Sequence, residues 1–240
     1  MIIVPPNKRV KLGSVSGGAD ATFLDRWLLD GRPAYPYKQT GGISAVVTPD
    51  VARNVNVLGV ARHLVPAGAT VDFGGLGTVT IPTWATNDIS YNAATLLPTL
   101  VSSGGSFSVS SSGTLIGDLW VGEGFELPDF LMGVARTPGA LKEWPSEGQG
   151  PYIQGIATRR AYEGSTILTE AQFRTLDDCY VATFDGSLPS LFILKDPDVP
   201  TWRTDEVILG VFHYVNRHQE GKRFTDVSIF EIPNTTWGGV

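Results

Sequence analysis

Apolar and polar residues alternate through most of residues 43–127, the pattern that predicts half-buried β-strands. ISAVVT runs up to Pro49, and RNVNVLGVAR places Val55 and Val57 on the inward side of a strand. GATVDFGG and GTVTIPTW give two more short strands divided by a glycine turn. For the Ser/Gly tract at 102–113, the two-residue period of SFSVS favours a strand over a linker. We therefore expect the first half of the chain to be a β-domain.

After residue 150 the pattern changes to one helix among strands. TEAQFRTLDDCYVAT predicts a helix in which Thr169 is the N-cap and Gln172 completes a capping box. Phe173, Leu176 and Tyr180 then share one apolar face. YIQGIATRRAYEGSTIL and SLFILKDP predict strands, and VILGVFHYVNRH and FTDVSIFEIP predict a longer pair joined by a hairpin loop at QEGKR. The second half is expected to be an α+β unit with the helix against a sheet.

Two segments lack the periodicity of packed elements. Pro5 and Pro6 prevent regular pairing, which predicts an extended N-terminal arm. Residues 128–150 combine Pro, Gly and mixed charge, as in an inter-domain crossing or a long loop. Because neither segment packs by itself, we expect both to contact neighbouring subunits. The expected organisation is an arm at 1–18, a β-domain at 19–127, a crossing loop at 128–150 and an α+β module at 151–240.

The composition of the chain excludes some classes of binding partner. The formal net charge is −6, and no cluster of Lys and Arg exists to neutralise phosphates, so we expect no nucleic-acid partner. No apolar run approaches the roughly 20 residues that span a bilayer, so no membrane span is expected. The N-terminus lacks the features of a signal peptide, which predicts a soluble protein that is not exported by that route. The single cysteine, Cys179, excludes an internal disulfide framework and is interpreted as a small core residue.

The sequence carries no recognisable catalytic or metal-binding motif. It has no G-x-S-x-G elbow, and GGLGTV lies between strands, as a hairpin turn does. His63, His213 and His218, with Cys179, are poor material for a zinc site. The acidic pairs, such as Glu123 with Glu126, are interpreted as surface charge or turn residues. We therefore expect no enzyme, no cofactor and no metal.

Tryptophans near loops are the remaining candidates for recognition. Trp144, Trp202 and Trp237 stand next to proline, glycine or polar residues, and we take them, with Pro5 and Pro6, as interface candidates. Ordinary packing is the alternative for each tryptophan. Trp120 lies within a strand pattern and is expected in the core.

The first half resembles discoidin-like (galactose-binding-like) β-sandwich domains. LLDGRPAYPY, followed by a strand, resembles the turn that leads into such domains, and NVNVLGVARHLVPAGATVDF resembles a later strand and hairpin. Within that run His63, Leu64, Gly68, Ala69 and Thr70 match the family pattern. The resemblance implies a sandwich. Asp30, Arg32 and His63 are the candidates for ligand binding. Sugar binding is not carried over, because only Asp30 matches the acidic ligand set near the first loop.

The second half resembles the C-terminal part of tail-associated proteins of long-tailed bacteriophages. LWVGEGFELP, RRAYEG, TEAQFRTLDD, LFILKDPD and FTDVSIFEI occur in that family's order. The resemblance covers roughly residues 20–232 when both stretches are combined. It implies a barrel-like module, a place in the virion tail, other tail proteins as partners, and assembly into a homo-oligomeric ring.

The leading hypothesis is thus a non-enzymatic tail-tip or minor tail protein that acts by assembly, localised in the virion tail and assembled in the host cytoplasm. The alternatives are a carbohydrate-binding module for a host-surface glycan, and a capsid decoration or neck protein. LLDGRPAYPY is interpreted mainly as a fold marker. In it Asp30 and Gly31 make a turn, and Arg32 pairs with a carboxylate or a backbone carbonyl rather than with a ligand.

Overall fold

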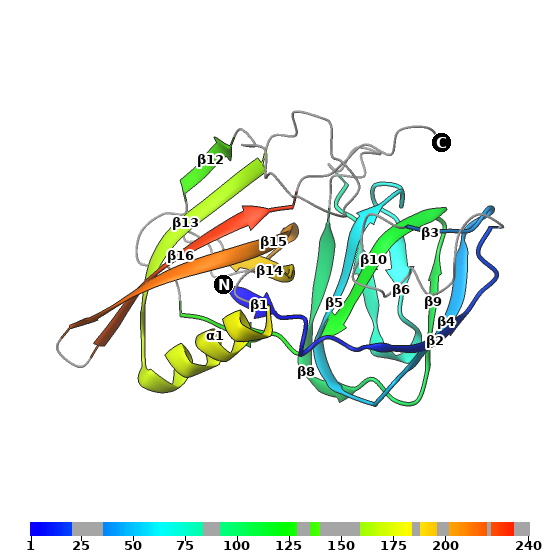
Figure 1. Cartoon of the computed structure of the whole chain (residues 1–240). Coiled ribbons are helices and arrows are strands. Elements are labelled where there is room, and N and C mark those ends of the chain that lie inside the picture. The colour runs from blue at the N-terminus through cyan, green and yellow to red at the C-terminus, as the bar shows by residue number, and fades with distance from the viewer. Residues whose placement is uncertain are drawn as a thin grey trace, which may run out of the picture.

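The computed structural model describes residues 1–20, 36–83, 92–128, 135–139, 159–183, 188–195, 202–219 and 222–232. Its elements, labelled in Figure 1, are β1 (Ile2–Val4), β2 (Leu12–Ser16), β3 (Tyr37–Lys38), β4 (Ile43–Pro49), β5 (Asn54–His63), β6 (Thr70–Asp72), the 3₁₀ turn η2 (Gly74–Leu76), β7 (Thr78–Thr80), β8 (Ala93–Ser102), β9 (Phe107–Ser111), β10 (Leu115–Gly122), β11 (Phe125–Glu126), β12 (Ala135–Gly139), β13 (Arg159–Leu168), α1 (Glu170–Ala182), β14 (Ser190–Lys195), β15 (Trp202–Gln219) and β16 (Lys222–Glu231). The chain is mainly β with one helix among the described residues, as the sequence predicts.

The first half forms a β-sandwich of two antiparallel sheets. One sheet has the order β2-β4-β9-β6-β7 and the other β3-β10-β5-β8. β4 alternates strictly between buried and exposed residues, so one face of the five-stranded sheet lies on the core and the other meets water. The core between the sheets includes Val47, Leu58, Phe73 and Leu119, all fully buried. The β-sandwich expected from the sequence is therefore present.

The two middle strands of the four-stranded sheet, β5 and β10, are buried on both faces over most of their length. All eight residues of β10 are buried, whereas an exposed sheet would alternate. Leu119 and Val121 face the sandwich core, and Trp120 between them belongs to a second core, which we call the junction core. A third sheet must therefore cover the outer face of this one.

That third sheet has seven antiparallel strands in the order β11-β1-β14-β15-β16-β13-β12. Alternate residues of its strands face opposite ways: Ile2 and Val4 enter the junction core, whereas Ile3 joins the core beneath α1. In the same way Leu191 faces the junction and Phe192 faces the helix. The layers therefore run from the five-stranded sheet through the four- and seven-stranded sheets to α1 (Figure 1).

Glycines allow the two inner sheets to approach closely. A Cβ added at Gly59 would lie 2.8 Å from Leu191 Cδ2, and one at Gly122 would lie 2.8 Å from Val4 Cγ1. One at Gly124 would lie 2.6 Å from Ile2 Cγ2. Real Cβ atoms essentially never show such separations, so a side chain at any of these positions would force its neighbours to shift.

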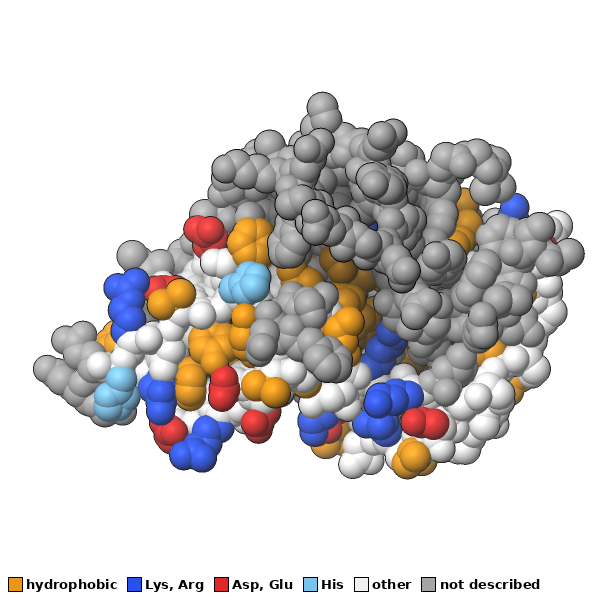
Figure 2. Space-filling model, viewed as in Figure 1, with side chains coloured by type: hydrophobic (Ala, Val, Ile, Leu, Met, Phe, Trp, Pro, Cys, Tyr) orange, Lys and Arg blue, Asp and Glu red, His pale blue; other side chains and the backbone are white. Residues whose placement is uncertain are grey.

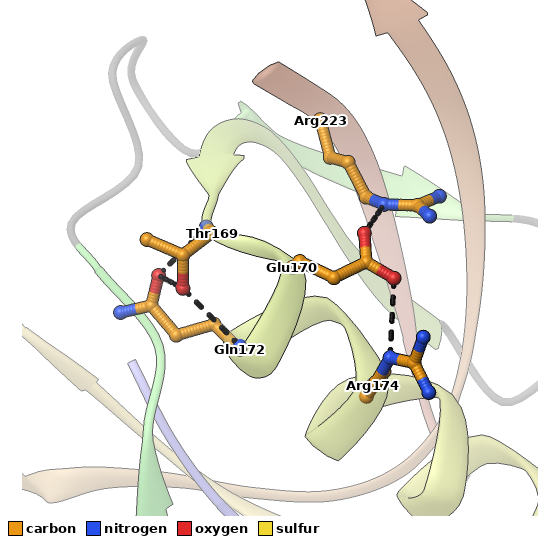
Figure 3. A network of polar contacts seen from close by, with 5 residues as sticks. All are labelled: Thr169, Glu170, Gln172, Arg174 and Arg223. Carbon is orange, nitrogen blue, oxygen red and sulfur yellow. Dashed lines mark hydrogen bonds and ion pairs between the residues drawn. The ribbon is translucent and has the colours of Figure 1, made fainter. Parts of the chain in front are cut away.

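The helix begins as its sequence predicts. Thr169 Oγ1 accepts a hydrogen bond from the Gln172 backbone N–H, and Gln172 Oε1 accepts one from the Thr169 N–H, which completes the capping box (Figure 3). Glu170 accepts hydrogen bonds from Arg174 on the next turn and from Arg223 on β16. These bonds hold the pKa of Glu170 below its usual value, with Arg223 as the largest cause. The first turn of α1 is thus tied to the sheet it covers.

Several boundaries differ from those expected. Residues 1–18 do not form an arm: β1 pairs with β11 and β14, and β2 pairs with β4. Pro5 and Pro6 instead separate two strands that belong to different sheets. The expected crossing at 128–150 contains β12, and its other residues after 128 lie outside the described part. The seven described strands form an open order with β11 and β12 at its ends, so the barrel-like module is not observed there.

Candidate functional site

The residues that the sequence offered for ligand binding do not assemble into a described site. Asp30, Gly31 and Arg32 lie outside the described residues. His63, at the end of β5, is buried, and its Nδ1 accepts a hydrogen bond from the Val65 N–H at 3.2 Å. Burial lowers the pKa of His63 to about 4, which leaves the imidazole neutral at pH 7. Its role as a ligand residue stays a prediction.

The interface candidates are also only partly described. Pro5 is buried and Pro6 half-buried, within a turn in which the Lys8 N–H donates to the Pro5 carbonyl. Trp144 and Trp237 lie outside the described residues, and only the backbone of Trp202 is described, at the start of β15. Contact of these residues with other subunits stays a prediction. Trp120 is buried in the core, as the sequence predicts.

A polar cluster that sequence reasoning missed lies where the sandwich meets the seven-stranded sheet. Arg9 and Asp118 form a buried ion pair, and Arg9 also donates to the Leu119 carbonyl at 2.5 Å. The Arg9 guanidinium stacks over the Trp120 ring, 4.6 Å from its centroid. With both side chains almost wholly buried, this pair holds the segment between β1 and β2 against β10.

Arg62 and Asn92 extend this cluster toward β15. Arg62 has a positive φ of 51°, rare for a residue with a side chain, and its N–H donates to Asn92 Oδ1. Asn92 Nδ2 donates in turn to the carbonyl of Val207 on β15. Burial lowers the pKa of Arg62, while Glu231 and Asp118 oppose that shift. Because its members are buried, we interpret the cluster as a set of polar contacts that hold the sheets together, not as a site open to a ligand.

The outer face of the five-stranded sheet offers a different kind of surface, which we call the hydroxyl face. Its exposed side chains are mostly serine and threonine, and none of its five strands contains Lys or Arg. In Figure 2 the right-hand end of the molecule, over β2 and β4, is mostly white where its residues are described, whereas charged side chains lie over α1, over the β15–β16 hairpin and along the lower middle of the view. The hydroxyl face consists of Ser14, Ser16, Ser44, Val46, Thr48, Thr70, Asp72, Thr78, Thr80, Ser108 and Ser110.

The strand register arranges these side chains in rows. Thr78 pairs with Asp72, Asp72 with Ser110, and Ser110 with Ser44, so four side chains form one row across β7, β6, β9 and β4. Neighbouring strands lie about 4.8 Å apart, which sets the spacing within the row. Asp72 Oδ1 accepts a hydrogen bond from the Gly74 N–H at 2.9 Å, which fixes the orientation of this carboxylate. Val46 is 43% exposed and gives the face an apolar element.

The other ionisable groups give no catalytic arrangement within the described ranges. Burial raises the pKa of the Cys179 thiol to about 12, so the thiol stays protonated at neutral pH. Burial also raises the pKa of Tyr214, whose hydroxyl donates to Asp177. In the part of the chain that the structure covers, no three His, Cys, Asp or Glu side chains gather as metal ligands. No described helix is long and apolar enough to cross a membrane.

Comparison with known proteins gives a limited likeness. No family model matches the chain, and no curated protein matches it. Among solved structures it is similar to truncated AlyQ with CBM32 and alginate lyase domains, at 13% identity and a TM-score of 0.36, over 54% of this chain and 36% of that chain. The chain therefore spans about a third of that two-domain structure.

Two shorter structures are covered almost completely. One is the CBM32 of AlyQ in complex with 4,5-unsaturated mannuronic acid, at 12% identity and a TM-score of 0.35, over 47% of this chain and 96% of that one. The other is the family 32 carbohydrate-binding module from Clostridium perfringens NanJ in complex with galactose. It shares 13% identity with this chain at a TM-score of 0.35, and the match covers 50% of this chain and 98% of that one. At such identities and scores the likeness says nothing about what this chain binds.

Proposed function

We propose that this chain is a non-catalytic binding protein that attaches to neutral polysaccharide through the hydroxyl face. One observation carries the proposal: the open face of the sandwich is an array of hydroxyl groups without a single basic side chain. The outer face of the sandwich's other sheet is covered by the seven-stranded sheet over its middle strands, and only the end of β8 is exposed there. A macromolecule recognised by a face of the sandwich must therefore meet the hydroxyl face.

The chemistry of this face suits a hydroxylated polymer. Each Ser and Thr hydroxyl both donates and accepts hydrogen bonds, as sugar hydroxyls do, so the two surfaces can pair in many local arrangements. Asp72 adds a carboxylate, which makes stronger hydrogen bonds than a neutral acceptor. The face contains no aromatic side chain, so recognition by ring stacking is not part of the proposal.

The energetics favour a long ligand over a short one. A hydrogen bond to protein contributes about 1 kcal/mol net, so one row of four side chains supplies about 4 kcal/mol. That corresponds to a Kd of about 1 mM before ordering costs are subtracted. A polymer that spans several rows, or several molecules, gains by effective concentration. Affinity should therefore rise steeply with chain length.

Charge selects among polymers. Asp72 is the only ionisable residue of the hydroxyl face, and the whole chain carries a net charge of −6. An acidic polysaccharide would meet repulsion without a compensating Lys or Arg on this face. We therefore expect the face to bind neutral polysaccharides, and to bind uronic-acid polymers more weakly than neutral ones at low salt.

The test is retention of the protein on a panel of immobilised neutral and acidic polysaccharides. Ser110→Lys puts a long charged side chain in the centre of the row, and its retention on neutral polymers should fall at least tenfold. Ser106→Lys makes the same change at an exposed position in the loop before β9, outside the face, and should bind like the native protein. Equal retention of all three proteins, or retention on no neutral polymer, would refute the proposal.

The tail-protein hypothesis rests on the sequence resemblance and stays a prediction. Its most direct check is imaging of intact particles that carry a label on this protein. The hypothesis and the proposed binding are compatible, because a virion part can also attach to a glycan. Localisation in a virion tail and assembly into a ring belong to that hypothesis.

A further inference from the structure

The hairpin of β15 and β16 extends beyond the strand that flanks it. β14 pairs with β15 up to Gly210, and β15 continues to Gln219 with β16 as its partner. Among the described strands, none pairs with the other edge of β15 beyond Gly210. Figure 1 shows this part of the hairpin at the end of the molecule opposite β2 and β4.

The register identifies the backbone groups on this open edge. The Ile232 N–H donates to the Leu209 carbonyl, so residues of odd number in β15 direct their backbone groups toward β16. The N–H and C=O of Tyr214, Asn216 and His218 consequently point away from β16, at the edge. Tyr180 of α1 reaches His213, with its hydroxyl 3.2 Å from Nδ1, and Asp177 of α1 accepts a hydrogen bond from the Tyr214 hydroxyl, so α1 lies over the side chains at the start of this edge. The segment from Tyr214 to His218 is the open edge.

This edge lacks most of the features that prevent strand addition. It contains no proline and no bulge, and Val215 in its centre is 60% exposed. Arg217 forms an ion pair with Asp226 on β16, 2.9 Å long, so its charge is partly neutralised and repels an incoming strand less.

We propose that the open edge pairs with the same edge of a second copy, antiparallel, with Asn216 on the twofold axis. Tyr214 then lies opposite His218, and Asn216 opposite Asn216, which matches the edge-facing backbone groups of the two strands. Self-pairing is favoured over another partner because the edge is complementary to itself about this axis, with one charged residue, Arg217, and one exposed apolar residue, Val215. Val215 then lies against the aliphatic part of Arg217, and no two like charges lie opposite each other.

The resulting dimer would join the two seven-stranded sheets into one. Because the hairpin and the hydroxyl face lie at opposite ends of the molecule, pairing through the hairpin leaves both hydroxyl faces open (Figure 1). A dimer would therefore present two such faces. The pairing itself does not depend on what the hydroxyl face binds.

The test is sedimentation velocity of the full chain over roughly a thousandfold range of concentration, because a reversible dimer follows mass action. The native protein should move from 25.7 kDa toward twice that mass. Asn216→Pro removes an edge-facing N–H without touching the ladder to β16, and Asn216→Asp places two like charges on the axis. Each should weaken dimerisation at least tenfold, with circular dichroism to confirm the fold.

Asn7→Asp is the matched control, an amide-to-acid change at an exposed residue far along the chain from the hairpin, and it should dimerise like the native protein. Because Asn216→Asp keeps the shape of the side chain, it carries the test if Asn216→Pro does not fold. A native protein that stays monomeric at every concentration would overturn the proposal. Undiminished dimerisation of a folded Asn216→Asp would do the same.

Discussion

Asp118 shows how much one buried charge can matter here. Its carboxylate is removed from water and paired with Arg9, which also binds the Leu119 carbonyl and the Trp120 ring. Asp118→Ala leaves the Arg9 charge buried without its partner, and should lower the free energy of unfolding by about 3–5 kcal/mol. Urea denaturation measures the loss.

Glu123→Ala is the control for that experiment. It removes the carboxylate of an exposed ion pair with Lys8, 3.2 Å long, and should cost less than about 1 kcal/mol. Similar losses for the two variants would contradict the view that the Arg9–Asp118 pair fastens the sheets together.

His63 predicts a specific dependence of stability on pH. Burial lowers its pKa from 6.5 to about 4, so between those values the unfolded chain binds a proton that the folded chain does not. The stabilisation is fully present above pH 6.5 and falls, by on the order of 3 kcal/mol, as the pH drops to 4. His63→Asn keeps an acceptor for the Val65 N–H and removes the titration. Denaturant midpoints of the two proteins should diverge below pH 6.5, and parallel curves would contradict the buried neutral histidine.

At this scale, prediction from sequence worked where the interaction is local. The capping box joins residues three apart, so Thr169 and Gln172 can be recognised from the sequence alone. Arg9 and Asp118 are 109 residues apart, and the sequence next to either residue does not indicate that the other is its partner. The burial of His63 was also missed, because burial depends on how distant parts of the chain pack and not on the residues beside it in the sequence.

At the scale of elements, the close approach of the two inner sheets depends on glycine. A Cβ at Gly122 would lie 2.8 Å from Val4 Cγ1 and 2.9 Å from the Lys8 carbonyl oxygen, so backbone must move. Gly122→Ala should therefore destabilise the protein by about 1–3 kcal/mol. Gly105→Ala, where nothing lies within 4 Å of the added carbon, is the matched control. Equal thermal stability of the two variants would contradict the packing of β1 against β10.

Elements were predictable where the hydrophobic period is sustained. β4, α1 and the β15–β16 hairpin follow their patterns. β1 was missed because it has three residues and is followed by Pro5 and Pro6, so its apolar run resembles the start of an arm. Its partners, β11 and β14, lie far along the chain, and only the folded sheet shows that the N-terminus belongs to the second half.

At the scale of the whole molecule, the third sheet changes the functional interpretation. It joins the sandwich to the α+β half through the junction core, so the two halves are not separate modules linked by a loop. By covering one side of the sandwich, it leaves the hydroxyl face as the broad surface open to a partner. Sequence reasoning could not single out that face, because its serines and threonines are unremarkable until the strand register aligns them in rows.

Binding of neutral polysaccharide by the hydroxyl face can be located residue by residue through amide chemical-shift mapping by NMR. A neutral polymer that retains the native protein would be digested to soluble fragments and titrated into the isotopically labelled chain. We expect the largest shifts on the row Thr78, Asp72, Ser110 and Ser44 and on its neighbours in the hydroxyl face. Shifts confined to other parts of the molecule, such as the loop at 64–69, would contradict binding at this face.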